Sequence, residues 1–488
     1  MNYSPIILNV TYYLLLLFFF LVIYILLTKN YLRNSTYFTI NFSIILSISV
    51  LLFFDQAYTW YIFYLKVARA SYANSTYSFG IDNLSIFLVL LSCFLLIICL
   101  LLYWFMKYKV TLYTLTLLLS VWLLLNVFTI LDLFFFFFFF EAVLIPMYYL
   151  VGIWGSRGRK IYAGYQLFIY TLLGSFFMMI AFFDIYMHTG TTSYLLYDLF
   201  MTNNYSADRQ YFIWFFLFLA FAVKIPLSPF HIWLPEAHVE APTPGSVLLA
   251  GVILKLGSYG VIRYIYEGPF IVITDNLIFV TYVFALIGFI YCAFVALNQP
   301  NMKKVIAYSS VSHMNFALLG LLTGTIYGYS GMILMMMAHG IAAAALFICL
   351  GVLYDKHKSL IIHYYSGFAK IMPIFTIMFF FVVLANIAFP GTFNFVGELL
   401  ITLGIVRLSL ITGIIVNIGL IITLVYSLAI FTRIFFGILK NVIIYSYCDA
   451  SRLEVYILIL FALLIVAFGI YPDVFIKFIT TLLAKLFN

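Results

Sequence analysis

Runs of about twenty apolar residues recur along this chain, and they restrict its fold more than any other feature. A helix needs roughly 20 such residues to cross the ~30 Å hydrocarbon core of a bilayer. Backbone groups in lipid must be hydrogen-bonded within the protein, which favours helices over open strands. The sequence therefore predicts an all-α integral membrane protein with about fourteen transmembrane helices. The predicted spans are 5–28, 37–55, 84–106, 110–130, 131–153, 162–186, 211–230, 246–266, 273–298, 303–324, 330–354, 369–408, 410–438 and 453–487.

The composition agrees with lipid as the solvent. Of the 488 residues, 66% are apolar and 8% are charged, whereas about a quarter are charged in soluble domains. The net charge of +8 comes from 24 Lys and Arg that form no basic stripe, which argues against nucleic-acid binding. Most of these residues follow odd-numbered spans. That bias predicts that the odd-numbered loops face the matrix if the membrane is mitochondrial.

The cysteines give no sign of a metal or redox centre. No pair has the CxxC spacing of a zinc or iron–sulfur site. They are Cys93, Cys99, Cys292, Cys349 and Cys448. No glycine-rich nucleotide loop follows a strand in the sequence. We therefore expect no cofactor, metal centre or disulfide in this chain.

Two of the predicted spans are interrupted by proline and glycine. The seventh is interrupted by residues 224–235, which include Pro226, Pro229 and Pro235, and the twelfth by residues 389–398, which include Pro390 and Gly391. Broken helices at matching positions of two halves are typical of inverted repeats with ion sites at the breaks. Helices 4–8 and 9–13 are therefore predicted to form two inverted five-helix repeats. The expected domains are residues 1–109 with helices 1–3, two half-channels at 110–270 and 271–440, and a last helix within 441–488.

Six ionisable residues are predicted to lie inside the membrane. Four of them fall nine or ten residues into their spans, roughly 14–15 Å deep, one precedes the break of the seventh span, and one follows the break of the twelfth. They are Glu141, Lys255, His313 and His339, with Lys224 and Glu398 at the breaks. A charge at the bilayer centre costs several kcal/mol, so such residues usually line a functional, hydrated pathway. The alternative is that they are structural ion pairs and hydrogen-bonded histidines.

A second polar group follows the break of the seventh span. It consists of His231, Glu236, His238 and Glu240. One interpretation is a metal site, but the spacing matches no helical ligand motif and prolines flank the segment. The sequence favours a polar loop that closes the broken helix.

Several motifs resemble one known family. Residues 224–242, followed by 245–260, are similar to the signature of the antiporter-like proton-channel subunits of respiratory complex I and the related Mrp antiporters. Residues 307–314 and 337–340 resemble the same family, so the match covers roughly residues 80–440. The first ~80 residues match poorly. Residues 140–147 are similar to the subunit-4 branch of this family, and so is Glu398 at the break of the twelfth span. The branches of subunits 2 and 5 usually have lysine at the position of Glu398.

The resemblance implies a role for each buried residue. Glu141 and Lys224 form the input pair and Lys255 connects the two halves. His313 and His339 continue the path, and Glu398 is the exit group.

The resemblance also implies a cellular setting. It predicts a multi-pass protein of the mitochondrial inner membrane that belongs to an NADH:ubiquinone reductase. Other membrane-arm subunits are the expected partners, with antiporter-like subunits 2 and 5 as neighbours. NADH, FMN, iron–sulfur clusters and ubiquinone are expected in partner subunits.

Two other functions remain open at this point. A Mrp-type cation/proton antiporter subunit shares the motifs around Lys224 and Lys255. A haem-carrying electron-transfer subunit is disfavoured, because no span has two histidines about fourteen residues apart.

Overall fold

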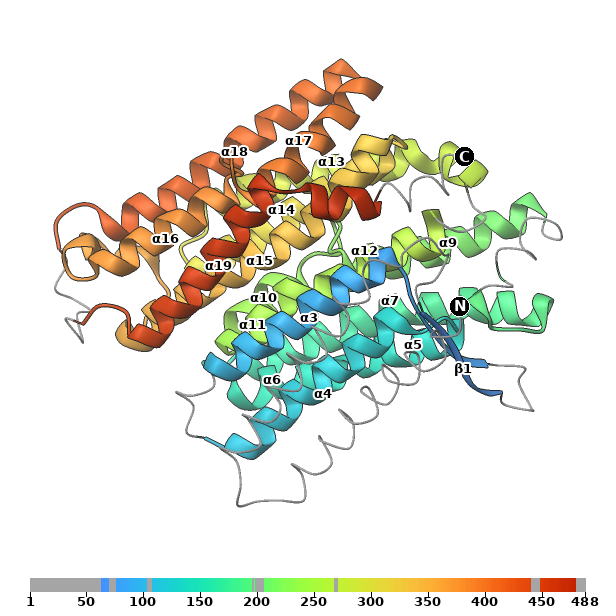
Figure 1. Cartoon of the computed structure of the whole chain (residues 1–488), viewed down its shortest axis with the longest axis horizontal. Coiled ribbons are helices and arrows are strands. Elements are labelled where there is room, and N and C mark those ends of the chain that lie inside the picture. Colours follow the sequence, from blue (N-terminus) through green and yellow to red (C-terminus); the bar gives the residue numbers. More distant parts are fainter. Residues whose placement is uncertain are drawn as a thin grey trace. The chain divides into compact units, whose positions relative to one another are not determined.

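The computed structural model describes residues 63–69, 76–102, 108–194, 197, 206–266, 271–439 and 448–479. The predicted spans at 5–28 and 37–55 lie outside these residues. Within them, long helices account for nearly all of the structure (Figure 1). The predicted helical membrane fold is confirmed.

Contacts divide the chain into two compact units. Of the described residues, unit 1 contains those between 63 and 224 and between 255 and 277, and unit 2 contains those between 225 and 254 and between 278 and 479. The chain therefore leaves unit 1 at Lys224, where the seventh span breaks, and returns to it at Lys255. The half-channels at 110–270 and 271–440 remain predictions, because a division of the chain by contacts does not show where a proton path begins or ends.

Unit 1 is built from helices that follow a short β-hairpin. Strands β1 (Phe63–Arg69) and β2 (Thr76–Ile81) are antiparallel. The helices are α3 (Asn83–Leu102), α4 (Val110–Thr129), α5 (Leu133–Ala142), α6 (Leu144–Trp154), α7 (Lys160–Thr189), α9 (Ala207–Lys224), α12 (Leu254–Gly260) and the π-helix η4 (Val261–Tyr266). The hairpin was not predicted. The Leu131 amide donates to the Ser78 carbonyl at 3.0 Å, so β2 is attached to the turn after α4.

A buried aspartate begins α5. The side chain of Asp132 accepts hydrogen bonds from the amides of Phe134 and Phe135, at 3.0 and 3.3 Å. Thr192 donates to the same carboxylate at 2.7 Å. These bonds satisfy amides that a helix N-terminus otherwise leaves without partners. Asp132 is therefore a buried carboxyl group with a structural role as the N-cap of α5.

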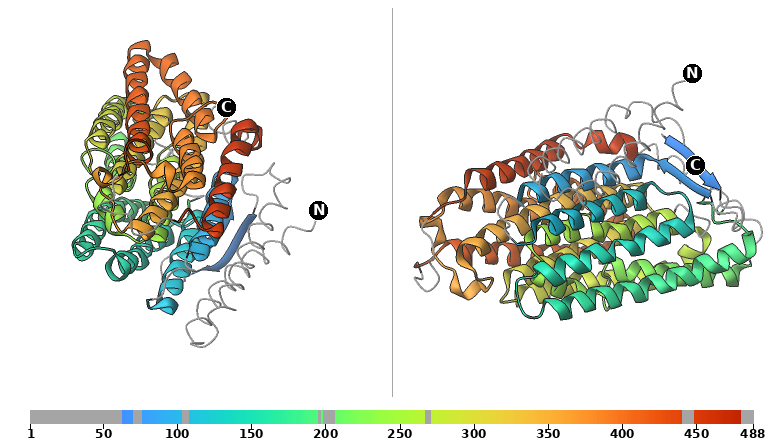
Figure 2. Two further views of the ribbon diagram at one scale, coloured as in Figure 1. Left: turned by 90° about the vertical axis from the view of Figure 1, so that its left-hand side faces the viewer. Right: turned by 90° about the horizontal axis from the view of Figure 1, so that it is seen from below.

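Unit 2 contains the remaining elements. They are α10 (Trp233–Glu240), α11 (Thr243–Leu248), the π-helix η3 (Leu249–Ile253), α13 (Ile271–Leu297, in this unit from residue 278), α14 (Met302–Leu322), α15 (Ile326–His357), the 3-10 turns η5 (Ile362–Tyr364) and η6 (Phe368–Lys370), α16 (Pro373–Asn386), α17 (Phe393–Leu408), α18 (Leu410–Phe435) and α19 (Arg452–Ile470). Helix α15 contacts α11, α14, α16, α17 and α19. Figure 2 shows α17 and α18, coloured orange, running alongside each other.

Small residues bring α15 and α17 into close contact. A Cβ atom added at Gly331 would lie 2.8 Å from the Ile401 amide nitrogen, and one at Gly397 would lie 3.0 Å from the Met335 amide nitrogen. Helix pairs in membranes commonly use glycine in this way, because it lets the backbones approach and pack. The contact places the middle of α17, with Glu398, against the middle of α15.

Predicted spans and observed helices agree closely where they can be compared. Within the described residues, each predicted span from 84–106 onward coincides with one helix or with consecutive helical segments, and the eighth (246–266) is made of α11, η3, α12 and η4. The fifth is divided at Val143, the seventh ends at Lys224, and the twelfth is divided between Asn386 and Phe393. In the part of the chain that is described, ten helices are long and apolar enough to cross a membrane. The full count of fourteen is not established by these residues.

Candidate functional site

Three of the predicted residues meet inside unit 2. His313 lies on α14, His339 on α15 and Glu398 on α17, and all three are buried. The His313 Nδ1 atom lies 3.5 Å from Glu398 Oε1. The two imidazole rings have centroids 5.7 Å apart. The break between α16 and α17 precedes Glu398, so the carboxyl group lies in the second turn of a half-helix.

The geometry of this cluster leaves hydrogen-bonding capacity unused. Both ring nitrogens of His313 and the Oε1 atom of Glu398 are buried and have no hydrogen-bond partner among the described residues. Imidazole and carboxyl groups can each take up and release a proton. Two such groups 3.5 Å apart, with His339 next in line, can pass a proton directly after a small movement or through a water molecule.

Two further predicted residues interact inside unit 1. Lys224 is the last residue of α9 and is buried, with its Nζ atom 4.5 Å above the centre of the Phe140 ring. Glu141 follows Phe140 on α5, and its carboxylate interacts with the Lys224 ammonium and the Ser175 hydroxyl. Neither Lys224 Nζ nor Glu141 Oε1 has a hydrogen-bond partner among the described residues. The lysine is therefore held by charge and by an aromatic face.

Lys255 lies in unit 1 on an irregular helix. It is fully buried in α12, which has the π-helical segments η3 before it and η4 after it. Segments of π-helix occur frequently at functional sites, because the extra residue per turn redirects side chains. A Cβ atom at Gly260 would lie 2.2 Å from the Phe221 ring. This close packing holds α12 against the last turn of α9, which ends at Lys224.

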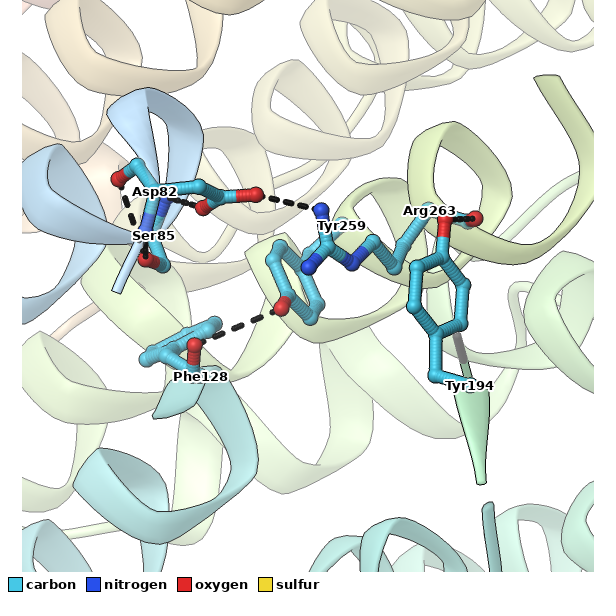
Figure 3. Close-up of polar contacts among 6 residues, drawn as sticks. All are labelled: Asp82, Ser85, Phe128, Tyr194, Tyr259 and Arg263. Atoms are coloured by element: carbon cyan, nitrogen blue, oxygen red, sulfur yellow. Dashed lines mark hydrogen bonds and ion pairs between the residues drawn. The ribbon is translucent and has the colours of Figure 1, made fainter. Parts of the chain in front are cut away.

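A buried ion pair in unit 1 was not predicted from the sequence. Arg263 in η4 forms an ion pair with Asp82, the residue before α3 (Figure 3). The Tyr194 hydroxyl donates to the Arg263 carbonyl at 3.1 Å, and its ring lies 4.5 Å from the guanidinium carbon. Ser85 donates its amide to Asp82 Oδ1 at 2.9 Å.

The ion pair keeps Asp82 ionised and ties η4 to the residue before α3. Burial by itself raises the pKa of Asp82, but the Arg263 guanidinium and the hydrogen bonds from Ser85 hold that pKa below its usual range. Tyr259, on the helix that carries Lys255, donates its hydroxyl to the Phe128 carbonyl at 3.3 Å (Figure 3). The only sign of this ion pair in the sequence was that Asp82 and Arg263, 181 residues apart, each lie near the end of an apolar run.

The polar group after the seventh span is dispersed rather than gathered into one site. Glu236 pairs with Lys304, with 2.5 Å between Oε1 and Nζ. The His238 ring stacks on Phe347 at 4.5 Å, and burial lowers the pKa of His231. The described residues contain no group of three or more His, Cys, Asp or Glu arranged to hold a metal ion. The expectation of a loop was wrong for residues 233–240, which form α10.

Comparison with known proteins decides the family. Residues 130–423 match the family described as NADH:quinone oxidoreductase/Mrp antiporter, transmembrane. The chain belongs to this family. The resemblance seen in the sequence motifs is thereby confirmed, and the match includes every residue of the predicted proton path.

Relatives within the family cover most of the chain. NADH-ubiquinone oxidoreductase chain 4 of Chondrus crispus is 43% identical over 427 residues, which are 87% of this chain and 84% of the relative. NADH-quinone oxidoreductase subunit M of Rickettsia typhi is 37% identical, over 88% of this chain and 86% of the relative.

Solved structures show the same fold. A chain of respiratory complex I from Thermus thermophilus with bound NADH superposes with a TM-score of 0.85 at 25% identity, covering 97% of this chain and 100% of that one. A chain of the archaeal membrane-bound sulfane sulfur reductase has a TM-score of 0.84 at 20% identity, covering 94% of this chain and 76% of that one.

Proposed function

We propose that this proton-pumping subunit of the complex I membrane arm conducts protons through its buried ionisable groups. The observation that carries the proposal is the contact among His313, His339 and Glu398, three titratable groups buried inside unit 2. Relatives named NADH-ubiquinone oxidoreductase chain 4, such as that of Arabidopsis thaliana at 42% identity, support complex I and the mitochondrial inner membrane. They favour this function over that of a Mrp-type antiporter.

The proposed path begins in unit 1 and ends at the twelfth span. Glu141 and Lys224 receive the proton, and Lys255 connects the two half-channels at 110–270 and 271–440. His313 and His339 carry the proton onward, and Glu398 releases it. Each of these groups costs free energy to bury, and a water-lined path is the usual reason that a membrane protein retains such groups.

The redox chemistry belongs to partner subunits in this proposal. By resemblance to the family, NADH, FMN, iron–sulfur clusters and ubiquinone bind elsewhere in the complex. Antiporter-like subunits 2 and 5 are the proposed neighbours of this chain in the membrane arm. Electron transfer in the partners and proton movement in this chain are then coupled, so that each limits the other.

Replacing either member of the input pair tests the proposal. Lys224→Ala or Glu141→Ala leaves the other charge buried without its counter-ion, which costs about 3–5 kcal/mol locally. We expect the complex to assemble, with proton pumping and quinone reductase turnover reduced together, each by at least about tenfold. The measurement is pumping and turnover in proteoliposomes at matched amounts of complex. Unchanged pumping in either assembled variant would exclude the pair from the path.

A further inference from the structure

An exposed amide lies on the outward face of α18. Within unit 2 this helix packs against α16, α17 and the 3-10 turns η5 and η6, and Figure 1 shows it, in orange, at an edge of that unit. The rest of its surface carries a stripe of five apolar side chains, each with 47–71% of its surface exposed. This stripe, called the α18 stripe, consists of Ile411, Ile414, Ile418, Ile421 and Val425. Asn417 is also exposed and lies beside the stripe.

Asn417 lies too deep in the membrane to reach water. Helix α18 has 26 residues, so it is about 39 Å long and exceeds the hydrocarbon core by about 9 Å. Asn417 comes about 10 Å along the helix from Leu410, where α18 begins. Part of the excess length lies at the other end, where Arg433 is exposed, so Asn417 lies within the hydrocarbon region. Its side chain is too short to extend to the interface as lysine and arginine do.

The Asn417 amide has no hydrogen-bond partner among the described residues. Two other asparagines in membrane spans, Asn126 and Asn315, donate their side-chain amides to the carbonyl four residues earlier, at 2.8 and 2.7 Å. No such bond joins Asn417 to the carbonyl of Gly413. Lipid chains offer neither donors nor acceptors, so an unpaired amide in the hydrocarbon region is strongly unfavourable. Membrane proteins commonly use asparagine for hydrogen bonds between helices, which removes this cost.

The α18 stripe has the geometry of a helix-packing surface. The spacing of its members alternates between three and four residues, so the stripe stays in contact with a second helix that crosses at about 20°. All five side chains are branched at Cβ and are therefore stiff, which limits the entropy lost when they pack. The outward face of α7 in unit 1 instead mixes side chains of different shape: Ile169, Phe176, Met179 and Phe183. Contact with lipid requires neither regular spacing nor branched side chains.

We propose that the α18 stripe and Asn417 bind one transmembrane helix of another membrane-arm subunit. The partner helix packs apolar side chains against the stripe and offers Asn417 an amide or hydroxyl side chain, which can donate and accept a hydrogen bond. This contact is independent of the proton path. Lipid and a second copy of this chain are the alternative occupants of the same face, and they give different results in the experiments.

Replacing the amide in the intact complex tests the contact. Asn417→Leu removes both hydrogen-bonding groups and keeps nearly the same shape. The variant leaves the partner's polar group unpaired in the membrane, so we expect the association to weaken about three- to thirtyfold. The measurement is the fraction of purified complex that keeps the neighbouring subunit during a detergent titration. Asn417→Gln, which keeps the amide, is expected to lose less.

A matched control lies on the same helix. Thr432 is exposed, and its hydroxyl already donates to the Ala429 carbonyl at 3.3 Å, so it needs no partner from another chain. Thr432→Val removes this hydroxyl and keeps the shape of the side chain. We expect Thr432→Val to retain the neighbouring subunit as the wild type does. Equal losses in Thr432→Val and Asn417→Leu would overturn the role assigned to Asn417.

Cross-linking identifies the occupant of the α18 stripe even if Asn417→Leu fails to assemble. A photoreactive benzophenone maleimide is attached to Ile421→Cys in the purified complex. The background is Cys448→Ser, because Cys448 is exposed whereas the other four cysteines are buried. The Cys448→Ser complex, labelled in the same way, shows which products come from cysteines of other subunits. We expect irradiation to join the probe at position 421 to one transmembrane helix of one neighbouring subunit.

Three further results would overturn the proposed contact. One is attachment of the probe to lipid acyl chains alone, and another is attachment to a second copy of this chain. The third is an Asn417→Leu complex that resists detergent as well as the wild type or better, because removal of an amide that faces lipid is favourable.

Discussion

The ionisable residues of the proposed proton path could be selected from the sequence because they lie deep inside predicted membrane spans or at the breaks in them. His313, His339 and Glu398 came from separate spans, and the structure brings these three together. Asp82 and Arg263 were missed because each lies near the end of an apolar run, where a charge is ordinary. Their pairing depends on a fold that brings the residue before α3 to η4, and nothing within either run indicates that contact.

The Asp82–Arg263 pair is expected to stabilise unit 1. Asp82→Asn leaves the Arg263 charge buried without its counter-ion, so we expect about 3–5 kcal/mol lower stability. A combined Asp82→Leu and Arg263→Met variant removes both charges and is expected to recover most of that loss. Thermal unfolding of the purified complex measures both variants. A double variant no more stable than Asp82→Asn would contradict this account.

The pH dependence of the same pair has a definite sign. The folded-state pKa of Asp82 lies below its ordinary value of about 3.9. Its contribution is therefore fully present above the unfolded-state pKa and is lost only as the pH falls through the lower folded-state pKa. We expect the difference in stability between wild type and Asp82→Asn to stay constant from about pH 5 to 8. A difference that shrinks within that range would mean that the carboxyl is not held ionised by Arg263.

At the scale of elements, apolar run length located the helices and proline located the breaks. Helix α9 ends at Lys224, two residues before Pro226, and α16 ends at Asn386, four residues before Pro390. The π-helical segments on either side of Lys255 were not predictable, because nothing in the sequence of residues 249–266 separates π-helical from α-helical winding, which depends on the neighbouring helices. The hairpin of β1 and β2 was missed because residues 55–81 have neither a long apolar run nor a clear alternation.

The close contact of α15 and α17 is expected to control the placement of Glu398. Gly331→Val puts side-chain atoms within 2.8 Å of the α17 backbone at Ile401, so the helices must separate. We expect about 1–3 kcal/mol lower stability, together with reduced pumping per assembled complex. Gly152→Val is the matched control, because no atom lies within 4 Å of a Cβ at that position. Thermal unfolding and pumping are measured for both, and equal losses in the two variants would argue against a specific role of the contact.

At the scale of the whole molecule, the central claim is that protons pass through a chain of titratable groups that ends at Glu398. The family and the membrane could be predicted from the sequence, because motifs such as residues 224–242 are long and specific. The order of transfer along the path could not, because it depends on water and on partner subunits. Glu398 is the most direct place to test the claim, since it lies in contact with His313.

The decisive measurement is proton pumping by Glu398→Gln and Glu398→Asp at matched amounts of assembled complex. Glutamine keeps the shape and hydrogen bonding of the side chain but cannot titrate, whereas aspartate titrates with a shorter reach. The account predicts that Glu398→Gln loses nearly all pumping and Glu398→Asp keeps a part of it. A structural role for Glu398 predicts the reverse order, because glutamine fits the site better. Wild-type pumping by Glu398→Gln would contradict the proposed path.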